Sequence, residues 1–140
     1  MADLSSITAV RPADNAVLNT DATYGATIAA GQTVYKDTAD ADKWKLADAD
    51  NTTATAGSGG IGIAVTPGVD GGKGIVATGG KVILVGTTMA VGTTYIVSDT
   101  PGGIKPTADA ATGDYVTIVG NASTTTQLDI TLVATGNQVP

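Results

Sequence analysis

The sequence predicts an all-β protein, a small β-barrel or sandwich built from two similar modules of about 60 residues with an extended N-terminal arm. Turn-forming clusters of Gly, Pro, Asp and Asn recur at short intervals, as in GSGG at 57–60 and TPGG at 100–103. The runs between these clusters are rich in Val, Ile, Thr and Tyr, which favour strands. No segment carries the apolar stripe of an amphipathic helix, so the sequence favours strands throughout.

The strands are expected, in chain order, at 24–29, 32–36, 43–47, 60–66, 74–78, 81–85, 93–98, 115–122 and 127–134. The last is the clearest, because Leu128, Ile130 and Leu132 alternate with polar residues at the period of a half-buried strand. Segment 46–56 is rich in Ala but also contains Asp, Asn and Thr, which compete for backbone hydrogen bonds. We therefore expect it to be a loop.

Residues 1–23 differ from the β-domain expected over 24–140, because their apolar residues are scattered and Pro12 interrupts them. We expect an extended arm with a short strand near Ile7–Val10. Two interpretations remain open at this point. The segment is either a terminal edge strand on its own domain, or an arm that reaches a neighbouring subunit.

The internal repeat divides the β-domain into residues 26–85 and 86–140. Four matches occur in the same order: Tyr35 with Tyr95, Trp44-Lys45 with Ile104-Lys105, 61–64 with 119–122, and 75–80 with 132–137. This alignment predicts equivalent core positions for Val76 and Val133. Two copies are too few for a solenoid, so we expect two β-modules packed about a pseudo-twofold axis.

The composition argues against an enzyme. The chain has no Cys and no His, and every one of its 13 acidic residues is Asp. Thiolate chemistry is therefore excluded, and the commonest general base and transition-metal ligand are missing. We expect no cofactor and no metal site; an Asp–Asp glycosidase is the chemistry that the inventory permits most easily.

The charge and the apolar content indicate which partners are compatible with the chain. A net charge of -6 disfavours nucleic acid and anionic membrane surfaces as partners. The opening residues lack the pattern of a signal peptide, so we expect synthesis in the cytosol. Val, Ile and Leu make up 30 of 140 residues, and so thin a core favours association with copies or with a larger assembly.

Three local motifs have a functional and a structural interpretation. VDGGKG at 69–74 lacks the order of a phosphate-binding loop and is expected to be a hairpin loop. Trp44 is the single Trp and is expected to be a core or interface anchor rather than a stacking platform. An acidic cluster is interpreted as a solvated loop rather than a calcium site; it comprises Asp37, Asp40, Asp42, Asp48 and Asp50.

The chain resembles the small capsid decoration, or cement, proteins of tailed bacteriophages, all-β head proteins often described only as a domain of unknown function. The resemblance runs from Gly31 to Gly136, and its most specific parts are GTTYIVSDTPGGIKPTAD at 92–109 and GDYVTIVGNA at 113–122. The N-terminal arm is covered less clearly.

The resemblance implies a structural protein of the virion that binds the outer face of the expanded capsid. It implies contact with the major capsid protein and homotrimers at threefold and quasi-threefold positions. On that basis the arm is expected to contact the capsid or a neighbouring subunit through Leu4, Ile7, Val10 and Val17. The alternatives are a head-fibre or tail-associated subunit that contacts the host, or a bacterial surface interaction module.

Overall fold

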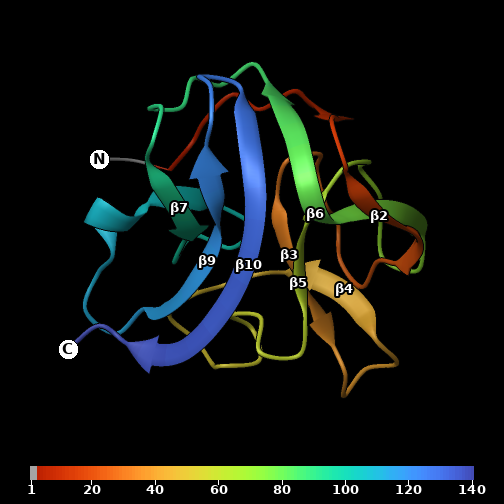
Figure 1. The fold of residues 1–140 in the computed structure, drawn as a ribbon. Helices are drawn as coiled ribbons and strands as arrows, with labels where there is room; N and C mark the ends of the chain where they lie inside the picture. Colours follow the sequence, from red (N-terminus) through yellow and green to blue (C-terminus); the bar gives the residue numbers. More distant parts are fainter. Residues whose placement is uncertain (1–2) are drawn as a thin grey trace.

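The computed structural model describes residues 3–140, which form one antiparallel sheet of ten strands curled into a half-barrel (Figure 1). Within these residues there is no α-helix, and one 3-10 turn, η1, spans Thr107–Asp109. The strands are β1 (Ala9–Pro12), β2 (Val17–Thr23), β3 (Thr33–Asp37), β4 (Lys43–Leu46), β5 (Ile61–Ala64), β6 (Lys73–Val85), β7 (Thr94–Val97), β8 (Ile104–Pro106), β9 (Tyr115–Ala122) and β10 (Gln127–Gln138). The predicted all-β class is confirmed.

The two halves of the sheet have matching strand orders, β4-β3-β5-β6 and β8-β7-β9-β10. The sheet runs β4-β3-β5-β6-β10-β9-β7-β8, and β1 and β2 both pair with β6 outside this path. Strand β3 pairs with β4 and β5, and β5 pairs with β6. In the same way, β7 pairs with β8 and β9, and β9 pairs with β10. The antiparallel pair β6–β10 joins the two halves.

Strand β6 bends in its middle and so takes part in both halves of the sheet. Its first half pairs with β2 and β5, and its second half pairs with β1 and β10. Gly80 lies at the bend with φ of 74°, and the backbone at Asn15 leaves no room for a Cβ there. The two strands expected at 74–78 and 81–85 are therefore one continuous strand.

Two further expectations about strands are wrong. The strand expected at 24–29 lies earlier, at β2, and Tyr24 and Ile28 form only isolated bridges. Strand β8 was not expected, because Gly102, Gly103 and Pro106 in and around it read as turn residues. It forms because β7 supplies a paired neighbour, which local sequence does not reveal.

The described part of the N-terminal segment, which was expected to be an extended arm over residues 1–23, pairs with the β-domain expected over 24–140. Strand β1 pairs with residues 82–85 of β6, and β2 pairs with residues 73–79. These backbone hydrogen bonds cover an edge of β6 that would otherwise be open. Of the two interpretations, the structure matches a terminal edge strand on its own domain.

The core consists of two groups of buried side chains. The larger lies mainly around β5, the second half of β6, β7, β9 and β10, and includes Met89, Tyr95 and Leu128. The smaller lies inside the curl of β2 to β6 and comprises Ala22, Tyr24, Ile28, Val34, Trp44, Ala64 and Val76. The larger group therefore spans both halves of the curled sheet, and the smaller group lies in the first half alone.

The register shows where the sequence repeat holds and where it fails. Lys45 lies opposite Tyr35, whereas Lys105 lies opposite Ile96, so the two tyrosines of the repeat differ by one residue in register. Val76 is fully buried but Val133 is 45% exposed, so their expected equivalence is wrong. The β5–β6 hairpin has a long glycine-rich loop over residues 65–72, whereas β9 and β10 join through the shorter segment 123–126.

Candidate functional site

The first residues that the structure describes line a shallow cavity between the two halves of the sheet. The Leu4 amide donates to the Ile104 carbonyl at 2.7 Å, and the Ser98 hydroxyl donates to the Asp3 carboxylate at 2.7 Å. A cavity of about 300 Å³ lies between this segment and loops 29–32 and 100–104. Its lining is mixed polar and apolar, and Asp3 is its single titratable residue within the described chain.

The four expected arm contacts, Leu4, Ile7, Val10 and Val17, differ in how far they are buried. Leu4 and Ile7 are half-buried and pack against the larger core group, and Val10 belongs to that group. Pairing of β1 with β6 directs Val10 inward, so it is not free to contact a capsid in this structure. Val17 alone of the four is well exposed, and it lies opposite Gly79 at the start of β2.

The second half of β10 is the clearest exposed surface. From Thr131 to Gln138 the strand pairs with β9 along one edge, and β6 has already turned away beyond Ile130 (Figure 1). All of these residues are exposed except the half-buried Leu132, and none of them is charged. Open strand edges are usually protected by charge or Pro, so this edge has the character of an interaction surface.

Trp44 and Tyr24 form the centre of the smaller core group. Trp44 is buried, as expected of a core anchor, and the Gly25 amide in the segment after β2 donates a hydrogen bond to the Trp44 carbonyl. The Tyr24 hydroxyl donates to the Thr66 carbonyl at 2.7 Å. The glycine-rich loop wraps this ring so closely that a Cβ at Gly68 or Gly74 would overlap it.

The acidic cluster of the sequence separates into two loops. Asp37 and Asp40 both pair with Lys45, at 2.9 and 2.8 Å. The hydrogen bond from Lys45 is the main reason why the pKa of each of these two carboxyls lies below its usual value. Among the described residues, no group of three or more Asp side chains lies close enough to hold a metal ion.

Asp48 lies in the other acidic loop. Burial, followed by a carboxyl–carboxyl hydrogen bond with Asp50, raises the pKa of Asp48 to about 6. At neutral pH this carboxyl is therefore charged in an environment that disfavours its charge.

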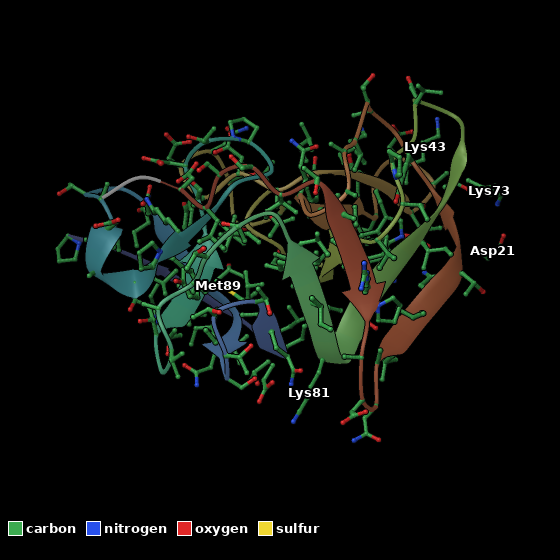
Figure 2. The ribbon with its side chains drawn as sticks, turned by 90° about the horizontal axis from the view of Figure 1, so that it is seen from above. Asp21, Lys43, Lys73, Lys81 and Met89 are labelled. Atoms are coloured by element: carbon green, nitrogen blue, oxygen red, sulfur yellow. The ribbon has the colours of Figure 1, made fainter. Side chains whose placement is uncertain are left out.

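Several exposed lysines mark the outer surface of the molecule. Figure 2 shows Lys43, Lys73 and Asp21 together at one end of the molecule, while Lys81 points into solvent elsewhere and Met89 lies within the other half. Lys73 pairs with Asp21 at 3.2 Å, and both side chains are largely exposed. Such a pair contributes little to stability.

A buried ion pair lies at the opposite end of the sheet. Lys105 on β8 is 4% exposed, and its Nζ lies 2.6 Å from Oδ2 of Asp114, which is 1% exposed and directly precedes β9. Asp99 lies 3.4 Å from the same Nζ. Burial disfavours the ammonium, but the hydrogen bond and charge of Asp114, together with Asp99, outweigh it and raise the pKa of Lys105.

Sequence reasoning did not single out this pair or Tyr24. Lys105 was visible only as the partner of Lys45 in the repeat, and Asp114 stands beside Gly113, where it reads as a turn residue. The signal that could have found the pair is the repeated lysine itself, since it occurs in the second module without the acidic run that accompanies Lys45.

Comparison with known proteins leaves the family open. No protein-family model matches the chain, and no curated protein matches it significantly. No helix within residues 3–140 has the length and apolar character required to cross a membrane.

Proposed function

We propose that this chain is a structural, non-enzymatic head protein of a tailed bacteriophage that binds the outer surface of the capsid and stabilises the shell. The resemblance over residues 31–136 supports this proposal. The observation that carries it is the second half of β10, an uncharged strand that is exposed and paired along one edge only. We expect the major capsid protein and further copies of this chain, as homotrimers at threefold positions, to be the partners.

Binding of this kind explains how a protein with a thin core stabilises a large shell. A protein that binds only the assembled lattice shifts the equilibrium toward that lattice by mass action. Several linked contacts bind more strongly together than each does alone, so no single contact has to be large. We expect synthesis in the host cytoplasm, followed by residence on the virion.

The palindromic strand order supports an origin by duplication of one β-module. Under this proposal, β3 to β6 and β7 to β10 are the two copies, and they form a small barrel or sandwich about the β6–β10 pair. The N-terminal strands β1 and β2 then complete the edge that the duplication leaves open.

The test is a binding assay with purified protein and phage heads that lack this chain. The heads are pelleted, and the bound copies are counted per capsid subunit. We expect saturable binding near one copy per subunit. Val133→Asp, on β10, is expected to weaken binding about tenfold or more, because an unpaired charge is costly in a contact.

Val91→Asp is the matched control, because Val91 is 63% exposed and lies in the loop before β7 rather than on β10. It is expected to bind like the original chain, and both variants are expected to unfold at unchanged temperature. If the heads bind no protein, the capsid role is wrong. Equal loss of binding in the two variants would instead contradict the assignment to β10.

A further inference from the structure

The Lys105–Asp114 pair combines three features that an amide-forming site needs. The amine and the carboxyl are in contact at 2.6 Å, both side chains are almost completely removed from water, and a second carboxylate, Asp99, lies 3.4 Å from the same nitrogen. Lys105 lies on β8, and Asp114 lies in the turn that directly precedes β9.

The carboxyl group of Asp114 is held in an unequal environment. Its Oδ2 accepts hydrogen bonds from Lys105 and from the Ala111 amide at 2.9 Å. Its Oδ1 is buried and has no hydrogen-bond partner within the residues that the structure describes. A buried ion pair is most favourable when every polar atom in it has a hydrogen-bond partner. In this pair, Oδ1 of Asp114 has none among the described residues.

We propose that Lys105 and Asp114 form an intramolecular isopeptide bond, with Asp99 as the group that transfers the proton. The site is a self-modification site, and it does not depend on the proposed capsid role.

The reaction balances without any further reagent. One proton moves from the ammonium to the carboxylate within the existing hydrogen bond, which produces a neutral amine and a neutral acid. The bond between Nζ and Cγ forms, and Asp99 accepts a second proton from the nitrogen. Asp99 then delivers this proton as the bond between Cγ and Oδ2 breaks and one water molecule leaves.

The surroundings favour this condensation over the reverse reaction. Burial disfavours the separated charges of the ion pair relative to a neutral amide. The Asp99 side chain is 39% exposed, so the proton carrier faces solvent and the released water has a way out. Once formed, the amide removes both buried charges from the site.

The first experiment is intact-mass measurement of the purified full chain. We expect its mass to lie one water molecule, about 18 Da, below that of Lys105→Arg prepared in the same way, after allowance for the substitution. Arginine keeps the positive charge opposite Asp114 but is a very poor nucleophile. The circular dichroism of both proteins shows whether the variant is folded.

Cleavage before Asp residues locates the bond. Without a cross-link, this digestion separates residues 99–108 from the fragment that begins at Asp114. With it, residues 99–108 stay joined to 109–128, because the amidated Asp114 is no longer a cleavage site. Trypsin is not informative here, since Pro106 follows Lys105.

The role of Asp99 is tested separately with Asp99→Asn, which is expected to retain the full sequence mass or to lose water much more slowly. If Asp99→Asn forms the bond as fast as the original chain, proton transfer by Asp99 is wrong. If the original chain keeps its full mass and yields separate fragments after prolonged incubation, the isopeptide bond itself is wrong.

Discussion

Lys45 on β4 and Lys105 on β8 are matched in the sequence repeat, yet one is partly exposed and the other is buried. Lys45 is 28% exposed and pairs with Asp37 and Asp40, whereas Lys105 is 4% exposed and pairs with Asp114 and Asp99. The two lysines that the repeat matches therefore have different electrostatic environments, and they also differ by one residue in register.

This difference predicts unequal effects of removing the two lysines. Lys105→Met leaves Asp114 buried without its cation and is expected to lower the free energy of unfolding by about 3–5 kcal/mol. Lys45→Met removes the cation of two solvent-screened ion pairs and is expected to have a much smaller effect. Urea denaturation of the two variants measures both values, and equal losses would show that burial does not separate the two sites.

Close packing around Tyr24 predicts the effect of adding one methyl group at Gly74, the second residue of β6. A Cβ at Gly74 would overlap the Tyr24 ring, so Gly74→Ala is expected to lower the free energy of unfolding by about 1–3 kcal/mol. Gly71→Ala is the control, because nothing lies within 4 Å of a Cβ there and its φ of 84° alone costs about 1 kcal/mol. Thermal or urea unfolding distinguishes them, and a loop that tolerated both equally would contradict the packing around Tyr24.

The raised pKa of Asp48 predicts how the stability of the folded chain changes with pH. Its pKa is about 6 in the folded chain and near 3.8 when unfolded, so the folded state holds the proton more tightly. The stability that this group contributes is complete below about pH 4 and is lost as pH rises through about 6. Asp48→Asn is therefore expected to reduce the fall in Tm between pH 4 and 7, and a pH series of thermal unfolding curves measures it.

Other carboxyl groups also affect the pH dependence of stability, and the Asp48→Asn variant keeps them all. Asp50 and Asp99 are the charges that act on Asp48, and both remain in the Asp48→Asn variant. Asp37 and Asp40, whose pKa values are lowered, act in the opposite direction and only below about pH 4. An unchanged pH profile in Asp48→Asn would contradict the burial of that carboxyl.

Deletion of residues 2–20 tests whether the N-terminal segment is needed for the β-domain to fold. It removes all of β1 and the first part of β2, and it exposes an edge of β6. We expect loss of the cooperative unfolding transition or a large fall in Tm, because Leu4, Ile7 and Val10 leave the core. A truncated chain that unfolds at the original temperature would restore the interpretation of this segment as a separate arm.

Particular residues show how far prediction from the sequence reached. Turn clusters and strand-favouring runs located the strands around Tyr35, Trp44, Ile61 and Tyr95, because turn chemistry and β-propensity act over a few residues. The burial of the candidate contacts in residues 1–23 depends on pairing with a distant strand, which local sequence does not reveal. Whether Val10 faces a neighbour or its own core depends on pairing with β6, more than seventy residues later in the chain.

The sequence by itself determined the all-β class, the glycine-rich turns and the charge inventory with no Cys, His or Glu. The tertiary structure alone decided the register of the two hairpins, the bend of β6 at Gly80, and the burial of Lys105 against Asp114. The physical reason is that propensity is a property of neighbouring residues. Register depends instead on which distant strand pairs with a given edge. Desolvation depends on which distant segments cover a side chain and shield it from water.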